Sequence, residues 1–170
     1  MCGVVGIIST QKPVAGELYD SLMHLQHRGQ DAGGIMTYNK RFHIKKGTGL
    51  VRDIFDQQNM SRLLGKIGIG HTRYPTVGGF SVEEAQPVLT HVPYGISMAH
   101  NGNLVNYSEL VDEVEKKDRR HINSSVDIEV ILHIFAHALD HPNPKNQSDS
   151  FFNQICSAVD EVFDRVKGAY

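Results

Sequence analysis

A cysteine stands directly after the first methionine, in the run Met1-Cys2-Gly3-Val4-Val5-Gly6. We expect Met1 to be removed because the cysteine side chain is small, which would make Cys2 the first residue of the mature chain. An α-amine has a pKa of about 7.7 to 8.0 and a thiol about 8.5, so the amine of Cys2 could accept the thiol proton near neutral pH. On position alone a small buried hydrophobe is the more common role of a cysteine, and a nucleophile that carries its own general base is the alternative that other motifs must support.

Three other stretches carry groups that could serve a reaction. The stretch His71–Thr76 leaves a glycine-rich strand and enters a loop, where functional groups are commonly presented. The dipeptide Asn101-Gly102 is a strong turn signal, so a plain turn is its simplest interpretation. The spacing Ser124-x-x-Asp127 fits a helix cap, in which the carboxylate would satisfy a backbone N–H.

Composition excludes several classes of protein. The 170 residues suffice for one domain, and 17 basic against 19 acidic side chains leave no electrostatic footprint for nucleic acid or an acidic membrane. With two distant cysteines and no long apolar run, we expect a soluble protein in the reducing cytoplasm and no disulfide framework. His133 and His137 share a helix face without a third ligand nearby, so we predict no metal site.

Hydrophobic periodicity predicts the elements that must position these residues. Asn106 should cap a helix with Glu109 as its capping-box partner, and Arg28-Gly29 should end a helix with a glycine cap. The predicted strands are 4–8 (buried), 33–38 with 41–45 as a hairpin, 65–71, 88–92 and 94–99; the predicted helices are 14–27, 51–64, one from 106, one from 124 to Pro142, and 150–167. Strands dominate the first hundred residues and helices the rest, which favours an α+β or layered α/β class.

The last predicted helix carries an apolar stripe at helical spacing, and we expect that stripe to be buried. Cys156 lies within it and is therefore interpreted as a core residue. The stripe comprises Phe152, Ile155, Cys156, Val159, Phe163 and Val166.

Together these motifs form one ordered set: Met1-Cys2-Gly3-Val4-Val5-Gly6, Gln26-His27-Arg28-Gly29-Gln30-Asp31-Ala32-Gly33-Gly34, Gly70-His71-Thr72-Arg73-Tyr74-Pro75-Thr76, Glu84-Ala85-Gln86-Pro87, Ala99-His100-Asn101-Gly102-Asn103-Leu104 and Ser125-Val126-Asp127-Ile128-Glu129. Over essentially its whole length the chain resembles the class II glutamine amidotransferase domain, and within that family the glutaminase half of the amidophosphoribosyltransferases of purine synthesis. The resemblance implies an N-terminal nucleophile hydrolase, a four-layer αββα sandwich of two antiparallel sheets in the α+β class.

The resemblance also implies roles for individual residues. Cys2 would attack the side-chain carbonyl of glutamine, with its own amine as general base, and a γ-glutamyl thioester would form. The Asn101 side-chain amide and the Gly102 backbone N–H would bind the oxyanion. Arg73 would bind the α-carboxylate of glutamine and Asp127 its α-ammonium group, while Tyr74 and Thr76 would add contacts from the same loop. Arg28 and His71 match the family blocks and are expected to support the terminus.

The partners follow from the resemblance as well. The full enzyme carries a C-terminal phosphoribosyltransferase domain that binds magnesium, and the chain lacks that domain's motifs, so we expect residues 1–170 to form the glutaminase domain without a cofactor of its own. An iron–sulfur cluster is not expected with only Cys2 and Cys156 available. A homo-oligomer is expected for the full-length enzyme. Two alternatives stay open: a sister amidotransferase with another acceptor, or a domain that is inactive until it docks on its partner domain.

Overall fold

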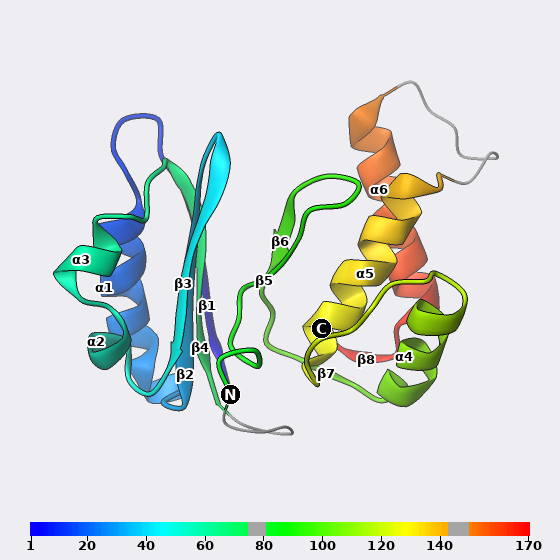
Figure 1. The fold of residues 1–170 in the computed structure, drawn as a ribbon, viewed down its shortest axis with the longest axis horizontal. Coiled ribbons are helices and arrows are strands. Elements are labelled where there is room, and N and C mark those ends of the chain that lie inside the picture. The colour runs from blue at the N-terminus through cyan, green and yellow to red at the C-terminus, as the bar shows by residue number, and fades with distance from the viewer. Residues whose placement is uncertain (75–80, 143–149) are drawn as a thin grey trace. The chain divides into compact units, whose positions relative to one another are not determined.

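The computed structural model describes residues 1–74, 81–142 and 150–170 (Figure 1). Thr76, one of the predicted substrate contacts, lies outside the described residues. The chain divides into two compact units, of which the first comprises residues 1–88 and 97–101 and the second residues 89–96 and 102–170. Each unit is described by itself below.

The first unit is built on a four-stranded antiparallel sheet in the order β1-β4-β2-β3. Its strands are β1 (Gly3–Ile8), β2 (Ala32–Asn39), β3 (Arg41–Thr48) and β4 (Ile67–Arg73). β4 lies between β1 and β2, and Thr72 pairs with Gly3 on one side and with Gly33 on the other. This central strand therefore connects the N-terminal strand to the rest of the sheet.

The expectation of a fully buried strand behind Cys2 is wrong for these residues. β1 is an edge strand of the described sheet, and Ile8 exposes 78% of its surface. Successive side chains of a strand point to opposite faces, so only the face of Val5 and Ile7 packs against the hydrophobic core. The apolar run alone could not distinguish a strand buried on one face from a strand buried on both.

Helices α1 (Ala15–Leu25), α2 (Val51–Ile54) and α3 (Gln57–Met60) cover one face of this sheet (Figure 1). The predicted stripe of α1 is confirmed, because Val14, Leu18 and Leu22 are fully buried. The core between the helices and the sheet comprises Val14, Ala15, Leu18, Leu22, Ile35, Val51, Ile54, Phe55 and Leu63.

Two predicted helix boundaries in this unit are wrong. The helix expected over 51–64 is interrupted at Phe55 and Asp56, because the Asp56 carboxylate accepts a hydrogen bond from the Asn59 N–H at 2.7 Å and starts a new helix there. α1 ends at Leu25 and continues as a short 3₁₀ turn, η1 (Gln26–Arg28). Gly29 is the C-cap of this 3₁₀ turn, with extended backbone, and its N–H donates to the Gln26 carbonyl at 3.1 Å. The predicted glycine cap therefore follows the 3₁₀ turn and not α1 itself.

The strands predicted around residues 33–45 and 88–99 are confirmed, with different lengths. β2 and β3 pair as a hairpin down to Asn39 and Arg41, with Lys40 at the turn in the left-handed region at φ 60°. β5 (Val88–Thr90) and β6 (Ile96–Met98) form a two-stranded sheet, and the chain passes from one unit to the other within these strands.

The second unit consists of three helices and a short antiparallel ladder. The helices are α4 (Tyr107–Lys116), α5 (Asp127–Asp140) and α6 (Phe151–Arg165). β7 (Asn103–Leu104) pairs with β8 (Gly168–Ala169). Antiparallel strands with segregated helices confirm the predicted α+β class.

The predicted buried face of α6 is confirmed only for Val166, which is buried, and Ile155, which packs partly buried against the core. It is wrong for the rest, since Phe152 exposes 70% of its surface and Phe163 61%, and Cys156 is an exposed free thiol. The helix buries Ala158 and Val162 in their place. Two apolar stripes run along this helix, and the one with the smaller side chains packs inward because Ala158 allows close approach to Ala138 and Leu139.

Asn106 precedes α4 as predicted, but it makes no side-chain cap hydrogen bond. Its Nδ2 donates to the Arg165 carbonyl and its Oδ1 accepts from the Lys167 N–H, both at 2.9 Å. The amide therefore binds the end of α6, and the capping-box interpretation is wrong.

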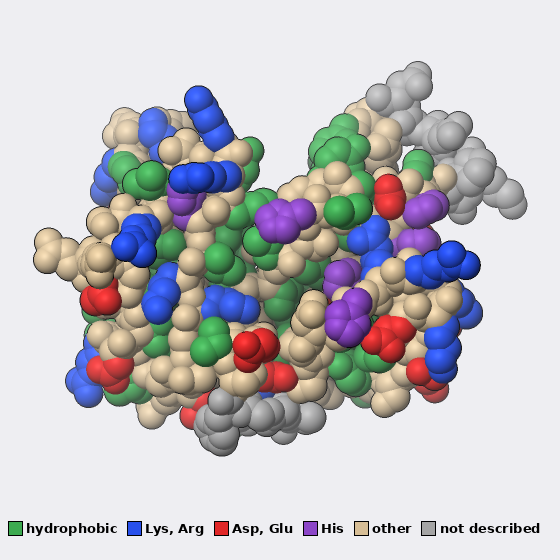
Figure 2. Space-filling model, viewed as in Figure 1, with side chains coloured by type: hydrophobic (Ala, Val, Ile, Leu, Met, Phe, Trp, Pro, Cys, Tyr) green, Lys and Arg blue, Asp and Glu red, His purple; other side chains and the backbone are tan. Residues whose placement is uncertain are grey.

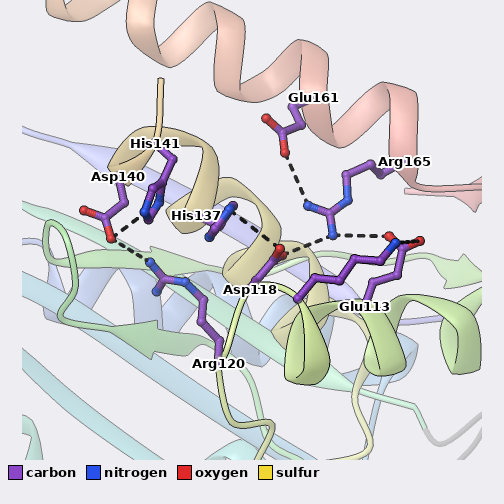
Figure 3. A network of polar contacts seen from close by, with 9 residues as sticks. Glu113, Asp118, Arg120, His137, Asp140, His141, Glu161 and Arg165 are labelled. Carbon is purple, nitrogen blue, oxygen red and sulfur yellow. Dashed lines mark hydrogen bonds and ion pairs between the residues drawn. The ribbon is translucent and has the colours of Figure 1, made fainter. Parts of the chain in front are cut away.

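A network of ion pairs joins the three helices of this unit (Figure 3). The Arg165 guanidinium lies 3.1 Å from Asp118, 3.4 Å from Glu113 and 3.3 Å from Glu161. Asp118 is also 3.6 Å from the Nε2 of His137. Arg165 and Asp118 are largely buried, so this network lies in a region where an unpaired charge would be costly.

Charged side chains of both signs are interspersed on the visible face of each unit (Figure 2). This pattern agrees with the near balance of basic and acidic residues. None of the helices in the described part of the chain has the length and apolar character needed to cross a bilayer.

We predict that Arg165→Met lowers the free energy of unfolding by about 1 to 3 kcal/mol, because it leaves the buried Asp118 carboxylate without its cation. Urea unfolding followed by circular dichroism measures this loss. Lys12→Met breaks an exposed pair with Glu17 and should leave the midpoint unchanged. Equal midpoints for Arg165→Met and the unmodified chain would contradict the role given to the network.

Candidate active site

The main chain around Cys2 is held on both sides by side chains from other elements. The Cys2 N–H donates to the Asn101 Oδ1 at 3.1 Å, and the Cys2 carbonyl accepts from the Arg28 Nε at 3.0 Å. The next amide, of Gly3, donates to the Thr72 Oγ1 at 3.2 Å. These three bonds fix an end of the chain that would otherwise fray, and Arg28 has the supporting position that the sequence predicts.

The thiol of Cys2 lies against the main chain of Tyr74. Its Sγ is 3.5 Å from the Tyr74 nitrogen and 3.8 Å from the Tyr74 carbonyl oxygen. These contacts fix the position of the sulfur beside the end of β4. Cys2 as a whole is partly exposed.

The contact with Cys2 determines which way the Asn101 amide points. Because an N–H group only donates, the amide oxygen must face Cys2, and the Asn101 Nδ2 is directed elsewhere. That NH₂ group can then donate to another acceptor beside the thiol. The arrangement suits a group that binds negative charge developing next to the nucleophile.

The plain turn predicted at Asn101-Gly102 is not formed, because both residues lie in irregular backbone between β6 and β7. Neither Asn101 nor Gly102 is among the described residues with positive φ. A Cβ on Gly102 would instead collide with the Ala169 carbonyl oxygen. Glycine is required here because β8 approaches the backbone closely, and this reason is independent of turn geometry.

Arg73 ends β4, directly before Tyr74, and is almost completely buried. Its guanidinium pairs with Glu84 at 3.3 Å, and Glu84 is equally buried. A guanidinium offers five N–H donors in a fixed plane, so a pair with one carboxylate orients the group and leaves capacity for a second carboxylate. The Gly29 position lies against this strand end, where a Cβ would come within 2.6 Å of the Arg73 main chain.

Asp127 belongs to the second unit and is the first residue of α5. Its Oδ2 accepts from the Leu104 N–H at 3.2 Å. The N-cap position is occupied by Val126 without a side-chain cap bond, so the predicted cap at Ser124 is wrong. The structure thus groups Cys2, Arg73, Tyr74 and Asn101 in the first unit and places Gly102 and Asp127 in the second.

Glu129 takes the role that the sequence suggested for Asp127. Its carboxylate accepts from the Asn123 N–H at 2.9 Å, from the Ser124 N–H at 2.8 Å and from the Ser124 hydroxyl. Burial alone would raise the pKa of Glu129, but the hydrogen bonds from His133, Ser124 and Asn123 outweigh it and lower the pKa to about 2. Glu129 therefore holds the loop that leads into Asp127.

Sequence reasoning assigned no role to Gln86 and only a supporting one to His71. Gln86 is buried, and its Oε1 accepts from the His100 N–H at 2.8 Å. His71 is fully buried in β4, and its Nε2 lies 3.1 Å from the His100 carbonyl oxygen. The only signal in the sequence was that Gln86 and His71 are polar residues within motifs where neither a turn nor a helix cap requires them. A single sequence does not show that the main chain of His100 is their partner.

Comparisons with known proteins show the family to which the chain belongs. Residues 53–142 match the family model of a glutamine amidotransferase domain. The chain is 49% identical over 172 residues to the amidophosphoribosyltransferase of Pasteurella multocida and 48% identical over 171 residues to that of Pseudomonas aeruginosa. All of this chain is covered in both comparisons, but it spans only 33% of the length of each relative.

A solved structure titled as the allosteric regulatory enzyme of purine biosynthesis matches with a TM-score of 0.80 and 31% identity. That match covers 100% of this chain and 34% of the solved one. The likeness extends over both units and supports the predicted fold of the N-terminal nucleophile hydrolase type.

We predict that Glu129→Gln lowers the free energy of unfolding by about 1 to 3 kcal/mol at neutral pH, because an amide offers one acceptor oxygen where the carboxylate offers two. The depressed pKa means that the contribution of Glu129 is complete above its ordinary value of 4.5 and is lost as the pH falls towards 2. Urea titrations at a series of pH values measure the gap between variant and parent.

The gap should narrow between about pH 4.5 and 2 and stay constant above that window. Glu109→Gln, at an exposed position, provides the control and should show no such gap. A gap for Glu129→Gln that is the same at every pH would show that the carboxylate charge is unimportant.

Proposed function

Because this chain belongs to the glutamine amidotransferase domain family, we propose that it hydrolyses the side-chain amide of glutamine to glutamate and ammonia with Cys2 as nucleophile. The observation that carries the proposal is the contact of the Asn101 amide with the Cys2 nitrogen, which places a thiol, an amine position and an oxyanion donor in one cluster. Few other reactions need these three groups together.

The nucleophile requires removal of Met1, which frees the nitrogen that donates to Asn101 as an α-amine. The free amine takes the proton of the Cys2 thiol, and the thiolate sulfur forms a bond to the amide carbon of glutamine. The Tyr74 N–H lies 3.5 Å from the Sγ and helps to hold the sulfur in place before the attack. With Met1 retained, the nitrogen is an amide that cannot accept a proton.

The tetrahedral intermediate carries its negative charge on the former carbonyl oxygen. The Asn101 Nδ2 donates to that oxygen, while the Asn101 Oδ1 keeps its contact with the Cys2 nitrogen. The Gly102 backbone N–H is the second donor in this proposal. The ammonium of Cys2 then gives its proton to the departing nitrogen, the C–N bond breaks, and water hydrolyses the resulting thioester.

Recognition of the amino-acid end of glutamine needs a cation and an anion. We assign the α-carboxylate to Arg73, whose guanidinium is oriented by Glu84, and the α-ammonium group to Asp127. Tyr74 and Thr76 follow Arg73 in the same stretch and, in this proposal, add contacts from the loop. Hydrogen bonding of the Asp127 carboxylate to the Leu104 N–H orients it for this role.

We further propose that the ammonia is used in purine synthesis by a phosphoribosyltransferase domain, as in an amidophosphoribosyltransferase. The support is the similarity to amidophosphoribosyltransferases, of which this chain spans a third. Magnesium and assembly into homo-oligomers would then belong to that larger enzyme. The hydrolysis proposed for this chain uses its own side chains, and its two free thiols suit a reducing cytoplasm.

The direct test is release of glutamate and ammonia from glutamine by the purified chain. We predict that Cys2→Ala lowers turnover by about 10³-fold or more, because no other group replaces the nucleophile. Cys156→Ala removes the exposed thiol of α6 and should leave turnover unchanged. Turnover by Cys2→Ala at the parent rate would overturn the mechanism.

Asn101 offers a sharper variant pair. We predict that Asn101→Ala lowers kcat by about 10²-fold to 10³-fold, the usual loss for one oxyanion donor. Asn101→Asp keeps an acceptor for the Cys2 nitrogen but lacks the N–H donors, so its kcat should fall at least as far. Steady-state kinetics with glutamine give both values, and a kcat near that of the parent for Asn101→Asp would exclude the side-chain amide as a donor.

A further inference from the structure

We infer that His71 and Gln86 are positioning residues for glutamine hydrolysis, which together hold the two peptides that flank His100 and thereby set Asn101 against Cys2. This inference rests on the proposed function and adds two residues to it. The segment that needs positioning lies beyond the end of β6, where His100 and Asn101 belong to neither a helix nor a strand. Regular secondary structure therefore does not determine the place of Asn101.

Both polar groups of the His100 main chain are bound by buried side chains. Its N–H donates to the Gln86 Oε1 at 2.8 Å, and its carbonyl accepts from the His71 Nε2 at 3.1 Å. The N–H belongs to the peptide between Ala99 and His100 and the carbonyl to the peptide between His100 and Asn101, so the peptides on both sides of His100 are held against rotation. The next residue, Asn101, is then placed to accept from the Cys2 N–H.

The two side chains are themselves anchored to the middle of the first sheet. His71 lies in the central strand β4, paired with Val4 of β1 and with Gly34 of β2. The Gln86 carbonyl lies so close to Gly34 that any Cβ there would collide with it. His71 pairs with Gly34, and the Gln86 main chain lies against the same Gly34. This close approach explains why position 34 is a glycine.

The side chain of Lys46 binds the main chain next to Gln86. The Lys46 Nζ donates to the Ala85 carbonyl at 2.6 Å, directly before Gln86. Because Lys46 belongs to β3, the segment of Ala85 and Gln86 is bound to that strand. His71 itself lies in another strand of that sheet, β4. His71 and Gln86 form a clamp on the His100 main chain, and both are thus attached to the same sheet. Such rigid support is needed for a functional group that must be positioned to a fraction of an ångström.

The chemistry of the His71 ring suits a permanent donor. A carbonyl oxygen only accepts, so the Nε2 carries the proton, and the ring is neutral with Nδ1 as the other nitrogen. The Nδ1 is buried and has no hydrogen-bond partner among the described residues, so a second proton there would be unsatisfied. Burial lowers the pKa of His71 to about 3, and the donor therefore does not titrate near neutral pH.

The test is a double-mutant cycle on glutamine hydrolysis by the full chain. His71→Leu removes the donor, and we expect kcat to fall about 10-fold to 100-fold with KM changed less than about threefold. In the Asn101→Ala background the same substitution should cost less than about threefold, because the residue it positions is already gone. His71→Gln restores a side-chain N–H and should recover most of the lost kcat.

Gln86→Met probes the other half of the clamp with a side chain of similar shape that cannot accept. It should show the same loss and the same lack of additivity with Asn101→Ala, and it decides the question alone if His71→Leu does not fold. His24→Leu is the matched control, since the His24 Nδ1 also contacts a carbonyl, that of Asp20, but on the exposed side of α1. It should keep the kcat of the parent.

Full activity in the clamp variants, or losses that add to that of Asn101→Ala, would overturn the positioning role. A failure of the proposed function looks different, because the parent chain would then not hydrolyse glutamine or Cys2→Ala would not reduce the rate. Unchanged pH dependence of kcat in His71→Gln is also expected, because neither the histidine nor its replacement titrates in the assay range.

Discussion

The hydrogen bond between the Cys2 nitrogen and the Asn101 side chain is the interaction on which the rest of the site depends. It joins residues 99 positions apart and fixes both the end of the chain and the orientation of an amide. The same contact also determines that the Oδ1 of Asn101 faces Cys2 and leaves its Nδ2 directed elsewhere. A site built at a chain terminus needs such a bond, because a terminal residue has neighbours on one side only.

The sheet of the first unit makes that bond possible. β4 carries Thr72, which binds the Gly3 N–H, and His71, which binds the His100 carbonyl. Adjacent side chains of a strand point to opposite faces. Thr72 therefore binds the terminal strand β1, while His71 binds the segment that carries Asn101. Its end, Arg73 and Tyr74, then supplies the guanidinium and the main-chain contacts to sulfur. The short distances between these groups follow from their shared strand.

Much of this could be predicted from the sequence, because periodicity and motif order are local properties. The strand behind Cys2, the β2–β3 hairpin, the stripe of α1 and the α+β class all follow from such patterns. The buried face of α6 did not, because two apolar stripes compete and only packing decides between Phe163 and Val162. Asp127 and Asn106 were misinterpreted for a related reason, since a capping pattern in sequence does not show that a distant N–H or carbonyl will take the side chain instead. The role of Gln86 depends on a contact with the backbone N–H of His100. Every residue other than proline has such an N–H, so the residue type at position 100 does not indicate the contact.

We propose that the catalytic group is Cys2 with a free amine. In the Cys156→Ala background, a cleavable leader can be designed so that a protease leaves either Cys2 or a glycine before Cys2 as the first residue, and iodoacetamide labelling then confirms that both forms keep the Cys2 thiol. The decisive measurement is the rate of glutamate release from glutamine by the two forms. We predict that the form beginning with Cys2 is faster by about 10²-fold or more, since a general base typically contributes 10² to 10⁴. Equal rates would show that the α-amine is not the base.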